Sequence, residues 1–366
     1  MKQKLLSLLF LLMGGVQGVC AQEAYAVLSE ENTKLTFYYD NQKESRGGLS
    51  VGPFEKSSQV SWRDAKKSIQ TVTFDASFAN CTSITSTASW FNGLKSLVKI
   101  DGIENLKTDN VTDMSGMFAA CYSLKELDLS HFNTSNVTNM SCMFCEIKGS
   151  ESLTTLDLSN FDTSKVTDMS EMFVESRSLA SINISSFNTS NVENMNSMFA
   201  ECEALTILNL SNFNTANVTD MEDMFRGCTN LTSIDLSTFN TANVTKMAQM
   251  FYGCSKLSTI YADEKKWSTN KIEPSTGGYF MFLYCPQLVG GNGTVYDIYH
   301  VDVDYARIDM PGQPGYLTAK TSSGIQTIVQ DKVVDGNAPI YNLSGKRLTS
   351  PQKGINIIGG KKVILK

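Results

Sequence analysis

The sequence predicts a repeat solenoid of the right-handed α/β type with β-rich caps, in which each coil of about 26 residues supplies a short strand and a short helix. Three repeated patterns predict it: a Val-Met-Met-Phe half, a Leu-x-x-Leu-x-Leu half, and a Phe-Asn-Thr loop between them. A fixed period in this range is typical of coils that stack and bury their apolar faces against one another. The motif Val-x-x-Met-x-x-Met-Phe begins at Val111, Val137, Val166, Val192, Val218 and Val244.

The two halves of each repeat differ in their apolar spacing. In the Leu-x-x-Leu-x-Leu half, the last two apolar residues are two apart, which is the strand period. In the other half, Val, Met, Met and Phe are spaced to share one face of a helical turn, which predicts a short helix. The gap from Val137 to Val166 is three residues longer than the regular period, because of an insertion near Lys148. The strand sets begin at Leu124, Leu153, Leu179, Leu205 and Leu231.

The loop between the halves is equally regular. A turn that is buried between coils must find partners for its backbone groups, and Asn or Asp side chains can bond neighbouring backbone. We therefore expect a structural ladder at Asn133, Asp162, Asn188, Asn214 and Asn240. The aromatic residue before each is expected to stack with its equivalents as a spine, at Phe132, Phe161, Phe187, Phe213 and Phe239.

The first 21 residues read as a secretory signal. Lys2 and Lys4 precede an apolar run, and Val19-Cys20-Ala21 provides a small-residue cleavage site. The run is too short to span a bilayer. Cys20 raises the alternative of lipid attachment, but the residues before it lack the expected Leu and small side chains. Removing the signal makes a chain of net charge −6 still more acidic, and without a basic run it is a poor nucleic-acid binder.

The mature chain is expected to contain four parts. Strand-like segments with polar turns predict a leading cap, because the first coil of a stack would otherwise expose its apolar cross-section. At the other end, short β-type runs such as Gly354–Ile358 follow a polar joint. The expected boundaries are a cap at 22–77, a solenoid at 78–262, a closing repeat and cap at 263–320, and a β tail at 321–366.

Stretches such as FNTSNVTNMSCMF and FNTANVTDMEDMF resemble the BspA-like leucine-rich-repeat surface proteins, over roughly residues 78 to 318. The resemblance implies a secreted or surface-displayed leucine-rich-repeat solenoid that binds host matrix or other cells. Residues 324–366 resemble the C-terminal domains that direct bacterial proteins through type IX secretion. That resemblance implies contact with the secretion machinery; a small β cap or stalk is the alternative.

Cysteine is the residue type most suggestive of chemistry. Ser176 occupies the same repeat slot as six of the cysteines, so the slot is expected to be a small buried packing site with free thiols. Disulfides remain an alternative for an exported protein. Cys142-x-x-Cys145 is a weak redox or zinc motif, and Cys145 is interpreted as a displaced ladder cysteine. The six in the slot are Cys81, Cys121, Cys202, Cys228, Cys254 and Cys285.

The sequence offers no residues for catalysis. His131 falls in a variable repeat slot and is interpreted as exposed, and His300 lies near Asp302 and Asp304, which read as surface charge. Neither a nucleophile elbow nor a phosphate-binding loop occurs. We therefore expect a non-catalytic protein without cofactor or metal.

The outward residue of each strand is the candidate ligand-binding position. These residues would tile the sheet face with short acids, amides and hydroxyls, forming a shallow polar surface for protein or glycan. An ordinary soluble face is the alternative, since an aromatic anchor is missing. A calcium ladder would need denser carboxylates. The candidates are Asp128, Asp157, Asn183, Asn209, Asp235 and Tyr261.

The expected function is therefore that of a secreted or cell-surface binding protein, an adhesin that recognises host matrix or other cells through the solenoid surface. One alternative is an envelope scaffold that binds other bacterial surface components. The other is an exported glycan-active enzyme, which would need two carboxylates at one cleft.

Overall fold

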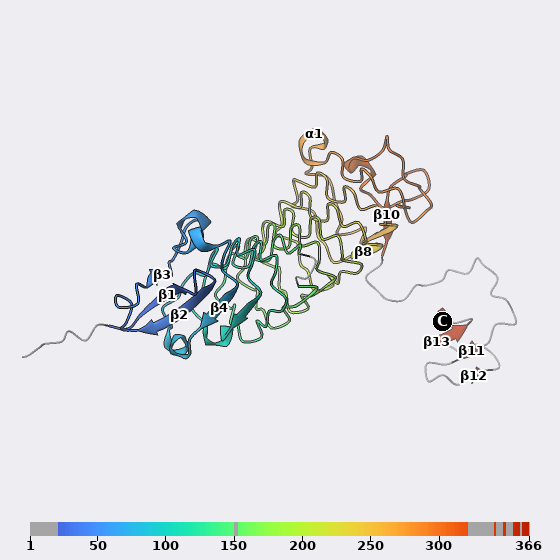
Figure 1. Ribbon diagram of the computed structural model, residues 1–366. Coiled ribbons are helices and arrows are strands. Elements are labelled where there is room, and N and C mark those ends of the chain that lie inside the picture. Colours follow the sequence, from blue (N-terminus) through green and yellow to red (C-terminus); the bar gives the residue numbers. More distant parts are fainter. Residues whose placement is uncertain are drawn as a thin grey trace, which may run out of the picture. The chain divides into compact units, whose positions relative to one another are not determined.

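The computed structural model describes residues 21–149 and 153–320 and four strands between residues 340 and 365 (Figure 1). The predicted signal and the expected run at Ile325–Val329 fall, apart from Ala21, outside the described residues. The chain divides into two compact units, Met1–Thr318 and Ala319–Lys366. Within the described ranges, we find no helix that is long and apolar enough to cross a membrane.

The first unit begins with a mixed five-stranded sheet of order β3-β1-β2-β4-β5. Strand β1 is antiparallel to β2 and β3, whereas β4 is parallel to β2 and β5, the arrangement that the repeats continue. Alternating buried aromatic residues hold this sheet to the first repeats: Phe37 stacks on Phe74 at 4.6 Å and on Trp90 at 5.0 Å. The strands are β1 Glu23–Ser29, β2 Lys34–Asp40, β3 Leu49–Ser50, β4 Thr71–Phe74 and β5 Lys99–Asp101, with 3-10 helices η1 Ser57–Gln59, η2 Arg63–Ala65, η3 Ala76–Asn80 and η4 Ile103–Asn105.

Short parallel strands follow in the repeats, at the positions where the apolar residues are two apart. Equivalent residues pair in register, as Leu156 does with Ile182 and Ile234 with Ile260. The sets that begin at Leu124 and Leu205 form no strand. The repeat strands are β6 Thr155–Asp157 and β7 Ser181–Asn183 in one sheet, and β8 Ser233–Leu236 and β9 Thr259–Ala262 in another. Strand β10, Leu317–Ala319, follows the repeats and extends the second sheet in the order β10-β9-β8.

The prediction of a short helix in each repeat is wrong. The one α-helix within the described ranges is α1, Pro274–Gly277, outside the repeated motif. In each repeat the residue two before the motif's Phe and the residue two after it both have a positive φ, as in Cys142 at 54° and Glu146 at 59° around Phe144. A left-handed residue cannot continue a right-handed helix. The motif therefore forms consecutive turns.

Alternate backbone donors of these turns bond the next repeat, while those between them, such as Met117 N to Met114 O at 3.2 Å, bond within their own repeat. Met114 N donates to Asn139 O at 3.0 Å, and Phe118 N donates to Met143 O at 2.9 Å. Since each buried N–H has one hydrogen to donate, donors used between repeats cannot also form an i to i−4 ladder. The apolar residues whose spacing resembled one face of a helix thus lie on the inner side of turns, and these turns bond the next repeat of the same chain.

A column of stacked phenylalanines runs through the core. The rings of Phe118 and Phe144 stack with centroids 5.6 Å apart and an angle of 3°. The predicted spine in the Phe-Asn-Thr loops is wrong in its choice of residue: those rings are buried, but the stacked pair among them is Phe213 with Phe239, at 6.3 Å. The continuous column consists of Phe118, Phe144, Phe173, Phe199, Phe225, Phe251 and Phe282.

A closing segment covers the last repeat. Phe282 ends the column edge-on against Tyr316 at 5.1 Å, and Trp267 Nε1 donates to Ala306 O at 2.8 Å beside the 3-10 helix η5, Val303–Tyr305. The second unit contains an antiparallel sheet of order β12-β11-β13-β14, in which the expected run Gly354–Ile358 forms a strand. Its strands are β11 Ile340–Tyr341, β12 Arg347–Leu348, β13 Gly354–Ile358 and β14 Lys361–Leu365.

Candidate functional site

Five of the six predicted ligand-binding side chains cap the turn that follows their strand position. Asp128 Oδ1 accepts from Ser130 N at 2.9 Å, and Asp157 Oδ1 accepts from Ser159 N at 3.0 Å. Hydrogen bonds from these serines hold the pKa of each carboxyl below its usual range. The largest contribution comes from the Ser130 backbone N–H for Asp128 and from the Ser159 side chain for Asp157. Each side chain therefore has a structural role before any ligand is considered. The same cap is made by Asn183, Asn209 and Asp235.

Two further columns of Asn and Asp make the same turn. In the loop column, Asn133 Oδ1 accepts from Ser135 N and Asn188 Oδ1 from Ser190 N, both at 3.1 Å, which confirms the predicted structural ladder. In the turn column, Asp113 Oδ1 accepts from Ser115 N at 2.8 Å. Three such turns in most repeats shape the chain locally, although Lys246 replaces the Asn or Asp of the turn column in the last one.

The ladder cysteines are free and buried, as predicted. Cys202 Sγ donates to Phe173 O at 3.1 Å, and Ser176, which occupies this slot in a repeat without the cysteine, donates through Oγ to Phe144 O at 2.6 Å. Burial raises the pKa of Cys228 to about 12, so the thiol stays protonated as a donor. The reading of Cys145 as a displaced ladder cysteine is wrong, because it forms a disulfide with Cys142 and Ile147 fills the slot.

The histidines have polar partners. His131 Nε2 lies 2.9 Å from Ile103 O, so the ring donates there. His131 is half-buried and not exposed as predicted, whereas Asn160 and Ser186 in the same slot are exposed. Near His300, Asp302 Oδ1 accepts from Phe280 N at 2.7 Å and so does more than carry surface charge. In the part of the chain that the structure describes, His, Cys, Asp and Glu do not form a group of three that could hold a metal ion.

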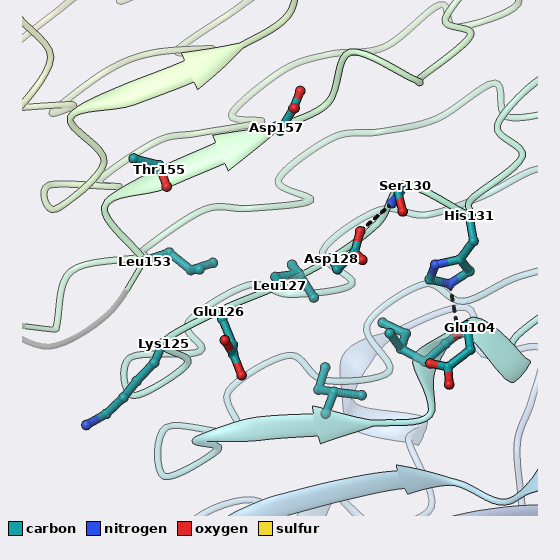
Figure 2. A pocket seen from close by; sticks show the side chains of 12 residues that line it. Glu104, Lys125, Glu126, Leu127, Asp128, Ser130, His131, Leu153, Thr155 and Asp157 are labelled. Atoms are coloured by element: carbon teal, nitrogen blue, oxygen red, sulfur yellow. Dashed lines mark hydrogen bonds between the residues drawn. The ribbon is translucent and has the colours of Figure 1, made fainter.

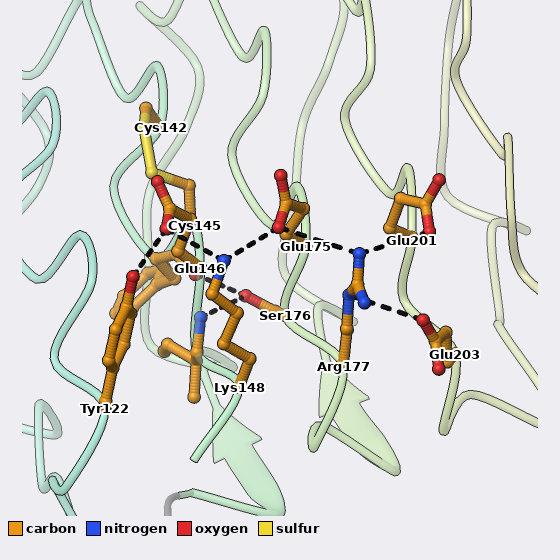
Figure 3. A network of polar contacts seen from close by, with 12 residues as sticks. Tyr122, Cys142, Cys145, Glu146, Lys148, Glu175, Ser176, Arg177, Glu201 and Glu203 are labelled. Carbon is orange, nitrogen blue, oxygen red and sulfur yellow. Dashed lines mark hydrogen bonds and ion pairs between the residues drawn. A yellow bond between two sulfur atoms is a disulfide. The ribbon is translucent and has the colours of Figure 1, made fainter.

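A chain of charged residues crosses the repeats on the Val-Met-Met-Phe side (Figure 3). Lys148 Nζ bridges Glu146 at 3.0 Å and Glu175 at 2.8 Å, and Arg177 continues the chain to Glu201 at 3.5 Å. Sequence reasoning missed it, although the recurring Glu two residues after Phe was visible. Because these charges neutralise one another, this surface is a weak candidate for binding a charged ligand.

The strand side carries a pocket of about 680 Å³ (Figure 2). It lies between β5 and β6, over the segment at 125–131 that forms no strand. Its lining includes Asp128 and Asp157 from the predicted set, whereas Asn183, Asn209, Asp235 and Tyr261 are not part of it. The apolar lining consists of Ile100, Ile103, Leu127 and Leu153, and the polar lining of Glu104, Lys125, Glu126, Asp128, Ser130, His131, Thr155 and Asp157.

The pocket coincides with the irregular repeat. Strand β6 follows the three-residue insertion, and β6 pairs with β7 but not with the preceding segment. That segment meets the β5 side through a long bond, Lys125 N to Val98 O at 3.4 Å. Between β8 and β9, neighbouring repeats pair along four residues, whereas the set that begins at Leu205 also forms no strand. The pocket therefore lies at one of two places where the strand pairing is interrupted.

Equivalent residues of successive repeats form parallel β-bridges, as Asp113 does with Asn139, so the chain is a repeat protein. The family model described as "Mycoplasma protein of unknown function, DUF285" matches residues 61–177 and 178–287. The chain belongs to this family. No curated protein matches it.

Solved structures of low similarity were also found. A leucine-rich repeat protein from Bacteroides ovatus is 16% identical over 73% of this chain and 80% of its own, with a TM-score of 0.30. A leucine rich cell surface protein from Faecalibacterium prausnitzii is 14% identical over 75% and 92%, with a TM-score of 0.23. A leucine-rich repeat protein from Eubacterium ventriosum is 15% identical over 69% and 92%, with a TM-score of 0.20. At such scores the likeness carries no argument about this chain.

Proposed function

We propose that this protein is an exported, cell-surface binding protein without catalytic activity, an adhesin that recognises host matrix or other cells. Its repeats are proposed to form a right-handed leucine-rich-repeat solenoid, of the kind found in the BspA-like surface proteins that the motifs resemble. The predicted signal and the tail at 324–366 are proposed to serve export and display.

The observation that carries the proposal is the strand side of the repeats. Exposed side chains of adjacent strands stand side by side there, as Thr155 does with Ser181, and the pocket opens on the same side. The backbone beneath is fixed by caps and by hydrogen bonds between repeats, so little ordering is needed when a ligand binds. A rigid, polar, extended surface suits recognition of a large partner.

The partners of the titratable groups support a non-catalytic role. The His131 ring bonds the Ile103 carbonyl, and ladder thiols such as Cys202 bond backbone carbonyls. Such groups are occupied in holding repeats together, whereas a nucleophile and its base would have to face each other at a substrate site.

A binding assay with the mature chain, residues 22–366, tests the proposal. Labelled protein is applied to immobilised matrix proteins, to host cells and to envelope fractions of the producing bacterium. The strand-side variant Thr155→Arg, Ser181→Arg and Ser233→Arg is compared with Thr167→Arg, Thr219→Arg and Thr245→Arg, which alter equally exposed residues in the column after the motif's Val.

The strand-side variant is expected to lose binding while the control keeps it. Equal loss in both would argue against the strand side. Binding to envelope fractions alone would favour the scaffold function over adhesion, and failure to bind any of these surfaces would reject both.

A further inference from the structure

We propose that the pocket between β5 and β6 binds an extended, positively charged peptide segment, with a Lys or Arg stem along the apolar floor and its cation among the carboxylates. The inference rests on the proposed binding function and names the class of partner. It concerns Glu104, Glu126, Asp128 and Asp157 above a floor that includes Leu127.

The charge of the lining favours a cation. The lining contains four carboxylates but one lysine, Lys125. It also contains His131, whose Nε2 already donates to a carbonyl. Hydrogen bonds from Ser130 and Ser159 keep Asp128 and Asp157 ionised at neutral pH. A carboxylate has about four acceptor positions, so one that caps a turn can still accept from an ammonium or guanidinium group.

The floor favours a long aliphatic stem. Ile100 and Leu127 are only half-buried and so can be reached from the pocket. Lys and Arg lay their methylene groups on apolar surface while the charged end stays in water. Phe, Tyr and Trp are absent from the lining residues, so the aromatic platform that would favour a sugar ring is missing.

The edge of β6 favours an extended backbone. Strand β6 pairs with β7 on one side, while Thr155 and Asp157 of the same strand line the pocket. An unpaired strand edge offers N–H and C=O groups to another extended chain, and side-chain pockets beside it then select the residues of that chain. The neighbouring segment at 125–128 lies between β5 and β6 (Figure 2) but forms no ladder with β6.

Fluorescence anisotropy of short labelled peptides tests the inference on the mature chain. The probes are capped peptides that alternate Lys with Thr, Glu with Thr, or Ser with Thr. The pocket variant Glu126→Gln, Asp128→Asn and Asp157→Asn removes three charges, and Asn can still cap the turns. The control, Glu193→Gln, Asp162→Asn and Asp304→Asn, removes three exposed charges elsewhere. Thermal unfolding of each variant verifies that it is folded.

We expect the Lys–Thr peptide to bind the wild type and the control alike, and the pocket variant about tenfold more weakly, since each exposed charge pair is worth a small factor. Equal weakening in both variants, or equal affinity for the Ser–Thr peptide, would overturn the inference. Lack of Lys–Thr binding to wild-type protein that still adheres to matrix or cells would reject this inference alone, whereas peptide binding without adhesion would reject only the proposed function.

Discussion

Thr163 and Asn188 hold adjacent repeats together with two hydrogen bonds through one hydroxyl. Thr163 Oγ1 donates to Asn188 O at 2.9 Å and accepts from Asn188 N at 2.8 Å. Thr163 is fully buried, so both backbone groups of Asn188 depend on it. The same reciprocal pair is formed by Thr108 with Asn133, Thr189 with Asn214, Thr215 with Asn240 and Thr241 with Ser268.

Replacing Thr189 with Val should destabilise the protein by about 1–3 kcal/mol, because an isosteric side chain without the hydroxyl leaves buried backbone groups of Asn214 unpaired. Urea unfolding measures the change. Thr206→Val, at an exposed position, serves as the control and should stay within about 0.5 kcal/mol of the wild type. An unchanged midpoint for Thr189→Val would show that the reciprocal bond does not stabilise the stack.

Replacing Phe199 with Ala should remove one ring from the continuous column and cost about 3–5 kcal/mol through lost burial and a cavity. Phe213→Ala should fall in the same range, since that ring is also buried. Unfolding should begin near the altered repeat because contacts in a stack are local, which hydrogen exchange can follow. If both variants kept the wild-type denaturant midpoint, the packed core would not be as described.

Asp223 should make stability depend on pH. Burial raises its pKa from 3.8 to about 6, and its Oδ1 lies 3.8 Å from Arg226 Nε, too far for a hydrogen bond. A carboxyl whose pKa is raised on folding stabilises the fold fully below pH 3.8, and this contribution is lost as the pH rises through 6. Asp223→Asn should therefore raise the melting temperature more at pH 7.5 than at pH 4.5. The opposite order would refute this assignment.

The ladder thiols should resist alkylation in the native state. All six are buried, and all except Cys81 donate to a carbonyl of the preceding repeat. Burial raises the pKa of Cys228 and Cys285 to about 12. Mass spectrometry after iodoacetamide treatment should find these cysteines modified only when denaturant is present. Rapid native labelling of Cys228 would contradict the buried ladder.

Deleting residues 324–366 should leave the repeats folded, because the two compact units divide at Thr318. If the tail is a sorting domain, the truncated protein should accumulate in the periplasm rather than at the cell surface. Fractionation and protease treatment of intact cells distinguish the two locations. Surface display that persists after the deletion would leave the tail as a cap or stalk.

Much of the repeat could be predicted from the sequence because it depends on neighbours in the chain. The motif residues such as Val192, Met195 and Met198 are fully buried, as their spacing indicated. The loop caps, such as Asn188 on Ser190, join residues two apart and need only local geometry. The buried thiol slot was visible because Ser176 replaces Cys there, and the structure shows both side chains donating to the same kind of carbonyl.

Only the tertiary structure decided whether the Val-Met-Met-Phe motif forms a helix or a turn, and only the tertiary structure determined where the pocket lies. Phe118 N is bonded by a carbonyl in the next repeat, at Met143, and a partner so distant in sequence cannot be inferred from the period of the apolar residues. The position of the pocket likewise depends on the tertiary structure, because β6 pairs with β7 but forms no ladder with the segment at 125–131. The sequence by itself determined which residues repeat and which are buried; the hydrogen bonds between repeats determined the backbone conformation, because buried N–H groups take whichever acceptor the neighbouring chain presents.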